Sequence, residues 1–348
     1  MKRMLYILFA FVSLSLASCA KTEDAPSIHG QEQLPSYIFF EPKVLDITET
    51  KAELLETSLP NASQTAYGVL GYYSDNTQIF VHQDYKNDNG LNIARLYRNG
   101  EREDFSYDHL APWNTGIHTF YAFYPYSLAD RVSVSDNIPY ISYTQPEKME
   151  GVVDILGCKL FSEKTGMVSI GFKHLLSALK ITVTNSQTTE VVLNEEGTKT
   201  TYDYPTLTIN SIVFSLVDFP LNAQLKFEDN GAPTYSAEAT NKTKRTYTIF
   251  SGAHKIGASN SQTNSATFTP LLFLPVTGLK YQIIINYTTE GGYNGEYNYS
   301  GSSDMVFTKG KVYSLNIKKT NDKLFIGKIE LIDSAGAWTD VNVPHTFN

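Results

Sequence analysis

The sequence predicts an all-β protein made of two successive β-sandwiches. Among its 348 residues are 23 Tyr and 19 Phe, and aromatic and β-branched residues recur in short runs between Gly, Asn, Asp, Ser and Pro. Long segments with apolar residues at helical spacing are scarce. The chain is also longer than a single hydrophobic core usually serves, so two domains are expected.

The expected strands form two groups. A polar stretch at residues 185–205 separates an N-terminal sandwich at 36–190 from a C-terminal sandwich at 205–348. The strands expected in the first group are 37–40, 65–73, 78–82, 91–97, 117–124, 167–172 and 176–184. Those expected in the second group are 207–216, 223–227, 246–250, 268–274, 282–287, 312–317 and 324–331.

Three local patterns refine this arrangement. In the run 179–184, Leu179, Ile181 and Val183 alternate with polar residues and should face a core. The run 120–126 is aromatic on both faces, so it should be a central strand, which Pro125 ends because proline cannot donate to a ladder. The pair at 291–292, Gly-Gly, predicts a hairpin turn.

The amino terminus predicts export. Residues 1–18 have a basic start, an apolar stretch and small residues before Cys19, as in a signal peptide. Residues 16–19, Leu-Ala-Ser-Cys, are typical of a lipobox, in which the thiol of Cys19 is acylated and anchors the protein. The alternative is an incidental cysteine beside a simple secretory cleavage site. Residues 19–35 are polar and should form a flexible tether. The acidic pair Glu23 and Asp24 after the anchor resembles the short signals that carry Bacteroidetes lipoproteins to the outer face of the outer membrane, which implies surface display.

Charge and cysteine content exclude several classes. The net charge of −8 argues against a nucleic-acid partner. Cys158 is the only other cysteine, so lipidation of Cys19 would leave it without a disulfide partner. Its apolar surroundings predict a buried, unreactive thiol.

The sequence offers no catalytic, cofactor-binding or metal motif. Phosphate-binding Gly-rich loops, His-Glu-x-x-His, Gly-x-Ser-x-Gly and Cys-x-x-Cys are all missing from it. The seven histidines are scattered, without close metal-ligand spacing, and His174 beside an expected core strand predicts a hydrogen-bonded core histidine. We therefore expect no enzyme, no cofactor and no metal.

A Tyr-, Asn- and Gly-rich stretch at 292–301 is open to two interpretations. It contains Tyr293, Tyr297 and Tyr299. Such a mixture is typical of an adaptable recognition loop, and it is equally compatible with a structural hairpin.

Several motifs together resemble the fimbrillin superfamily of Bacteroidales, the lipoprotein pilins and their tip and anchor relatives. The most specific is the Phe-x-His-x-x-Ser-x-Leu pattern, which here is Phe172, His174, Ser177 and Leu179 within 168–185. Weaker matches are Trp113 with the aromatic run 120–126, the segment 153–156, and 310–317 followed by Trp338.

The resemblance implies two transthyretin-like β-sandwiches and assembly by strand exchange with other fimbrial subunits at the outer membrane and cell surface. A protease removes the first strand, here 37–40, and a neighbour's strand fills the groove, with 338–347 as the candidate donor. Stalk pilins of this family are commonly cleaved after an arginine, and this chain has none between Arg3 and Arg95. Lys43 and Lys51 are the candidate cleavage sites, or else the uncleaved chain serves as an anchor or tip.

The sequence is also compatible with two other functions. The Tyr-rich stretch and the tether favour a surface lipoprotein that binds a host or bacterial glycan or protein. A hydrolase has no positive motif.

Overall fold

A computed structural model describes residues 37–46, 55–57, 66–98, 105–163, 166–188, 190–193, 197, 199–202, 204–227, 234–235, 243–290 and 293–332. The described part is nearly all β, as the sequence predicts. Its helical segments are the short 3-10 turns η1 (Gln83–Tyr85), η2 (Tyr126–Arg131) and η3 (Met149–Gly151). No described helix is long and apolar enough to cross a bilayer.

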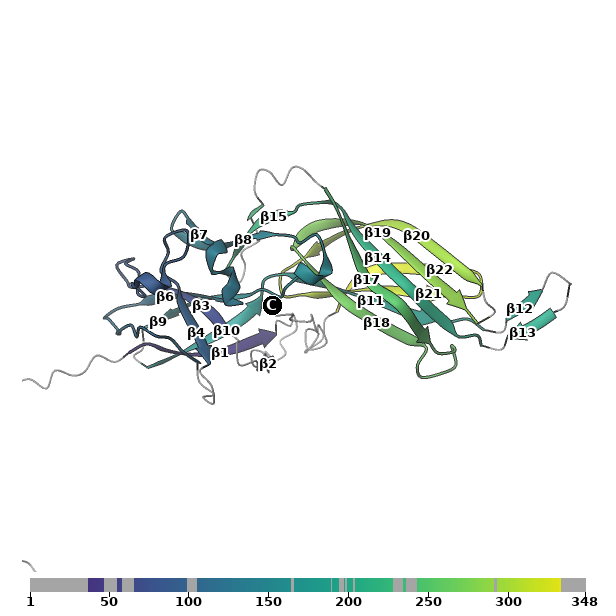
Figure 1. Ribbon diagram of the computed structural model, residues 1–348, viewed down its shortest axis with the longest axis horizontal. Coiled ribbons are helices and arrows are strands. Elements are labelled where there is room, and N and C mark those ends of the chain that lie inside the picture. Colours follow the sequence, from purple (N-terminus) through teal and green to yellow (C-terminus); the bar gives the residue numbers. More distant parts are fainter. Residues whose placement is uncertain are drawn as a thin grey trace, which may run out of the picture. The chain divides into compact units, whose positions relative to one another are not determined.

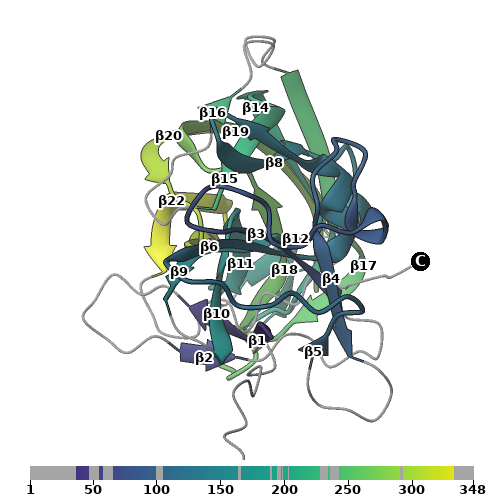
Figure 2. The same cartoon turned by 90° about the vertical axis from the view of Figure 1, so that its left-hand side faces the viewer.

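The first half of the chain builds an eight-stranded sheet in the order β2-β1-β10-β9-β6-β3-β4-β5. Figure 2 faces this part of the molecule and shows β1 beside β10. Its strands are β1 (Phe39–Asp46), β2 (Leu55–Thr57), β3 (Ala66–Tyr72), β4 (Ala94–Arg98), β5 (Phe105–Ser106), β6 (His118–Tyr124), β9 (Leu156–Ser162) and β10 (Met167–His174). All its pairs are antiparallel except β1 with β10, which run parallel.

Two four-stranded sheets make up most of the second half (Figure 1). One has the order β18-β11-β21-β22, from β11 (Ser177–Asn185), β18 (Ser265–Phe273), β21 (Val312–Lys319) and β22 (Leu324–Ile332). The other has the order β17-β14-β19-β20, from β14 (Leu207–Phe219), β17 (Thr243–Ile256), β19 (Val276–Thr289) and β20 (Asn294–Phe307). Buried residues of both sheets share one core, which is the arrangement of a β-sandwich.

Two smaller sheets complete the fold. One, β16-β15-β8-β7, joins β7 (Val132–Ser135) and β8 (Ile138–Thr144) to β15 (Asn222–Lys226) and β16 (Thr234–Tyr235). The other is the hairpin of β12 (Glu190–Leu193) and β13 (Lys199–Tyr202). The pairing of β8 with β15 links early and late chain, and next to it the side chain of Gln145 donates to Leu272 O at 3.1 Å.

The buried side chains form two separate clusters. We call the first the aromatic core; it consists of Ile38, Phe40, Tyr67, Val69, Ile79, Phe80, Tyr85, Ala94, Leu96, Phe105, Tyr107, Ala111, Phe120, Ala122, Tyr124, Leu156, Cys158, Val168, Ile170 and Phe172. The main core covers the other face of the eight-stranded sheet and fills the sandwich, running from Leu70 to Ile329. Both cores belong to one compact unit, Ser36–Asn348.

Most of the expected strands are confirmed. Every expected run except 78–82 overlaps a strand of the structure. Leu179, Ile181 and Val183 are buried, β6 is a central strand that ends just before Pro125, and Cys158 is buried.

The run 78–82 is not a strand, so that prediction is wrong. Gln78 forms an isolated bridge with Tyr72, and two tight turns follow, in which Val81 N donates to Ile79 O and His82 N donates to Phe80 O. Consecutive turns of this kind use the backbone groups that a ladder requires.

The expected boundary at 190–205 stays a prediction. β11 lies before it in the chain, yet its ladder partners β18 and β21 both lie after it.

Candidate assembly site

Residues 37–41, which open the first described segment of the chain, alternate between exposed and buried side chains. Ile38 and Phe40 are 0% and 3% exposed, whereas Tyr37 and Phe39 are 40% and 42% exposed. This two-residue period is that of a strand laid over a core. The segment therefore contributes both side chains and backbone to the aromatic core.

Phe40 is a buried side chain that the first strand contributes to the aromatic core. Its ring meets that of Phe120 edge-on at 5.3 Å between centroids, and the rings of Phe80 and Tyr107 lie at 6.1 and 6.2 Å. Burying a phenylalanine completely stabilises a fold by roughly 1.5–3 kcal/mol, and edge-on aromatic pairs add to this. Without Phe40, three aromatic rings would lose their common neighbour.

Most of β10 depends on β1 for its backbone pairing. β10 is registered with β1 from Phe39↔Met167 to Val44↔Phe172. Within the described chain, its register with β9 covers only Lys173 and His174. Residues 167–172 therefore have β1 as their ladder partner, and if β1 were removed they would become an open sheet edge.

A second set of hydrogen bonds holds the start of this segment. Ile38 N donates to Ala111 O at 3.0 Å, and the hydroxyl of Tyr107 donates to Ile38 O at 2.6 Å. The same hydroxyl accepts from Ala111 N at 3.2 Å. Burial raises the pKa of Tyr107 well above its ordinary value, so this hydroxyl stays neutral and able to donate.

The predicted processing residues are only partly described. Lys43 lies in β1 opposite Gly171 of β10. Cys19, Lys51 and the candidate donor segment 338–347 lie outside the described residues. Lys51 falls between β1 and β2 in the sequence.

The three tyrosines of the predicted recognition loop lie on and beside β20. Tyr293 precedes the strand and is 62% exposed. Tyr297 and Tyr299 lie within β20, half-buried, with nearly parallel rings 6.4 Å apart. The expected hairpin is present, because β19 pairs antiparallel with β20.

The glycines among these tyrosines have a packing role. Gly295 is paired with Tyr287, and Gly301 with Tyr281, across the β19–β20 ladder. A Cβ at either glycine would lie 2.3 Å or 2.6 Å from the Tyr ring opposite. Each glycine thus leaves space for a ring from β19, an arrangement that covers glycine backbone in a strand.

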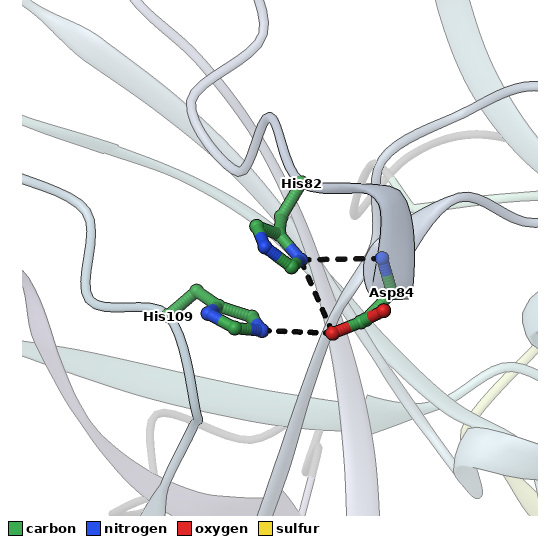
Figure 3. Close-up of side chains that lie close together, drawn as sticks. All are labelled: His82, Asp84 and His109. Atoms are coloured by element: carbon green, nitrogen blue, oxygen red, sulfur yellow. Dashed lines mark hydrogen bonds and ion pairs between the residues drawn. The ribbon is translucent and has the colours of Figure 1, made fainter.

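A cluster of ionisable side chains lies elsewhere on the first half, formed by His82, Asp84 and His109 (Figure 3). Asp84 Oδ2 lies 3.3 Å from His82 Nδ1 and 3.0 Å from His109 Nε2. Sequence reasoning missed this cluster because its two histidines lie far apart in the chain. The pattern His-x-Asp at 82–84 was its only local signal.

Comparison with known proteins decides the family. The sequence pattern of the fimbrillin-like family matches residues 62–333, which is most of the chain. The chain belongs to the fimbrillin-like family. The resemblance seen in the sequence is thereby confirmed.

Solved structures align with the chain at low sequence identity. A candidate cell adhesion protein from Bacteroides ovatus aligns with a TM-score of 0.51 and 14% identity over 85% of this chain and 98% of its own. A fimbrial protein from Bacteroides vulgatus aligns with a TM-score of 0.49 and 13% identity, over 85% and 99%. The fimbrial anchor protein Mfa2 of Porphyromonas gingivalis gives 0.36 and 9%, over 86% and 98%. No curated protein sequence matches the chain.

Membership of this family also answers whether the chain is an enzyme. Fimbrillin-like proteins are structural and adhesive proteins and not enzymes, so the chain is not an enzyme. Its described features agree with that assignment: the one buried histidine–carboxylate pair, His174 Nδ1 with Asp154 Oδ2 at 2.8 Å, follows from the placement of His174 at the end of a core strand.

Proposed function

We propose that this fimbrillin-like chain is a fimbrial subunit that is exported as a lipoprotein through Cys19, displayed on the cell surface, and assembled by donor-strand exchange. In this proposal a protease removes the segment that contains β1, and a strand from a neighbouring subunit takes its place beside β10. The support comes from family membership and from the way β1 is held.

One observation carries the proposal: β1 is the ladder partner of residues 167–172 of β10, and it comes from the very start of the described chain. Removing it would expose both a sheet edge and the side chains of Val168, Ile170 and Phe172, which are at most 3% exposed. An exchanged strand with alternating apolar residues would pair with the backbone of the open edge and fill the exposed core with its side chains. Strand addition to a sheet edge works in this way.

The geometry favours Lys51 over Lys43 as the cleavage site. Cleavage after Lys43 would divide β1 and leave Val44–Asp46 paired with β2. Cleavage after Lys51 would release the whole of β1, because the strand ends at Asp46. A backbone inside a ladder is also a poor protease substrate, since a protease must bind the chain without its sheet partners.

The test compares two matched lysine variants in cells that assemble the fimbria. Lys51→Ala should block trimming and abolish polymers, whereas Lys43→Ala should leave both unchanged. Polymers are scored by ladders on denaturing gels without boiling. Normal polymer formation by Lys51→Ala, or its loss in Lys43→Ala alone, would contradict this choice of site.

A glycan- or protein-binding role at the cell surface is the second candidate. It is favoured by the 62% exposure of Tyr293, whose ring lies 6.5 Å from that of Tyr287. Aromatic faces of this kind stack on sugars and on partner side chains. Calorimetry against a glycan panel tests it: Tyr293→Ala should abolish any binding found, and binding that survives this change would exclude Tyr293 as the site.

A further inference from the structure

The cluster of His82, Asp84 and His109 brings two separate segments together. His82 caps the start of η1, which contains Asp84, and its Nδ1 accepts from Asp84 N at 3.2 Å. His109 comes from the segment after β5, and its ring stacks on that of His82 with centroids 3.4 Å apart and 22° between planes. All three ligand atoms lie within 4.8 Å of one another.

The hydrogen bonding of His82 places its Nδ1 lone pair against the carboxylate of Asp84, and the two atoms repel each other. Because Nδ1 accepts the Asp84 N–H, it carries a lone pair and no proton. The same Nδ1 lies 3.3 Å from Oδ2 of the Asp84 carboxylate, so two electron-rich atoms face each other. Protonating both imidazoles would instead stack two cations face to face at 3.4 Å. A cation that takes the Nδ1 lone pair in place of the Asp84 N–H would attract Nδ1, Oδ2 and Nε2 alike.

We propose that His82 Nδ1, Asp84 Oδ2 and His109 Nε2 bind one divalent transition-metal ion of the zinc type. Bonds of 2.0–2.1 Å in a tetrahedron place neighbouring ligand atoms about 3.3 Å apart. The distances from Oδ2 to the two nitrogens, 3.3 and 3.0 Å, match that spacing. To bind, neutral His109 offers the lone pair of Nε2 and carries its one proton on Nδ1, so no net proton is released by this residue.

The donor set selects the class of metal. Imidazole nitrogen suits zinc, copper, nickel and cobalt, whereas calcium and magnesium require oxygen ligands throughout. The side chains are 34%, 59% and 40% exposed for His82, Asp84 and His109, so an ion can enter and water can complete its coordination.

Tyr85 already holds the backbone of the two segments, so binding requires only that the stacked imidazole rings turn until their lone pairs converge on the ion. Tyr85 is 4% exposed and follows Asp84 directly. Its hydroxyl accepts from His109 N at 2.7 Å, and its own N donates to His82 O at 3.1 Å. One buried residue, through its hydroxyl and its backbone N–H, thereby fixes the backbone on both sides of the cluster, which lowers the entropy cost of metal binding.

The site has a consequence for the first strand, which rests on the proposed function. His109 lies between Tyr107 and Ala111, the residues that hold Ile38. A metal bridging His109 to η1 would restrain the segment on which β1 begins. Occupancy should therefore slow the removal of β1.

Cobalt absorption tests the site itself on the untagged, purified full chain. Titration with Co²⁺ should give a saturable ligand-field spectrum at one ion per chain, which Zn²⁺ displaces. His82→Ala and His109→Ala should each weaken binding by about tenfold or more, because even outer-shell partners of a metal contribute on that scale. His254→Ala, which removes an exposed histidine of β17, should bind as the parent does.

Two outcomes would overturn the site: no saturable binding, or equal affinity in the parent and in His82→Ala. Thermal unfolding without metal checks that the variants fold, and Asp84→Asn, which keeps the shape of the side chain, provides a second variant. Trypsin digestion with and without Zn²⁺ tests the link to β1 separately. Zinc should slow loss of the first strand in the parent and not in His109→Ala. If zinc binds and the rates stay equal, the metal site stands and its control of β1 is wrong; a failure of donor-strand exchange itself would leave the cobalt titration unchanged.

Discussion

The aromatic core and the main core are filled by different parts of the chain. Ile38 and Phe40, from the first described segment, lie in the aromatic core, whereas the described residues of the main core begin only at Leu70. The strands differ as well: β1 has 8 residues in a parallel pair, and β14 and β19 have 13 and 14 in an antiparallel pair. We therefore expect loss of the segment that contains Ile38 and Phe40 to open the aromatic core and to leave the main core closed.

Truncating one aromatic side chain in each core should produce the largest change in stability. Phe40→Ala and Phe214→Ala should each lower the free energy of unfolding of the untrimmed chain by about 3–5 kcal/mol, because each removes a fully buried ring. Urea unfolding of the purified chain measures both.

The two variants should differ after assembly. A polymer made from trimmed subunits no longer contains residue 40, so Phe40→Ala polymers should melt like the parent, and Phe214→Ala polymers should melt lower. Equal destabilisation of both polymers would mean that β1 remains in the assembled form.

A smaller effect is expected from the hydroxyl that holds Ile38. Tyr107→Phe removes both the donor to Ile38 O and the acceptor of Ala111 N, and the loss of these buried hydrogen bonds costs about 1–3 kcal/mol. The first strand should then be released faster by trypsin, followed by intact mass spectrometry.

Tyr67→Phe is the matched control within the same core. Tyr67 is fully buried, and its hydroxyl has no hydrogen-bond partner among the described residues. Removing that hydroxyl should leave both stability and release rate nearly unchanged. Equal release rates in the Tyr107 and Tyr67 variants would argue against the Tyr107 contact as the hold on β1.

The sequence predicted the regular parts of this fold well, because burial there repeats along the chain. In β11, Leu179, Ile181 and Val183 all point into the main core, and the period was visible at once. β20 was missed for the opposite reason: its exposed positions are mostly Asn, Glu, Asp and Ser, and its inward face includes glycines that receive rings from β19. Its composition therefore resembles that of a loop.

The candidate sites depended on contacts that no local pattern contains. The first strand was recognisable from the alternation at 37–40, but its parallel pairing with β10, more than a hundred residues later, was not. The His82–Asp84–His109 cluster depends on Tyr85 fixing a second segment, so spacing alone could not predict it.

Alkaline pH should lower the stability of the two cores alike. We expect this effect to be smaller than those of the substitutions above. Burial raises the pKa of Tyr124 in the aromatic core and of Tyr281 in the main core to about 12. A raised pKa means that the folded state favours the neutral phenol, so this stability is complete below pH 10 and is lost as pH rises from 10 towards 12.

Urea unfolding at pH 9 and pH 11 measures this loss. Tyr281→Phe should reduce the difference between the two pH values, since it removes one of the groups that must ionise. A variant with the same loss as the parent would show that Tyr281 does not contribute to it.

Hydrogen–deuterium exchange can show directly whether a strand from a neighbouring subunit replaces β1 beside β10. The experiment follows the amides of Met167–Phe172 in three states. If a neighbour's strand replaces β1, these amides should exchange slowly in the untrimmed chain, fast after trimming, and slowly again in the polymer, while β14 stays protected throughout. Amides of β10 that remain protected in the trimmed, unassembled chain, or exposed in the polymer, would contradict the replacement of β1 by a neighbour's strand.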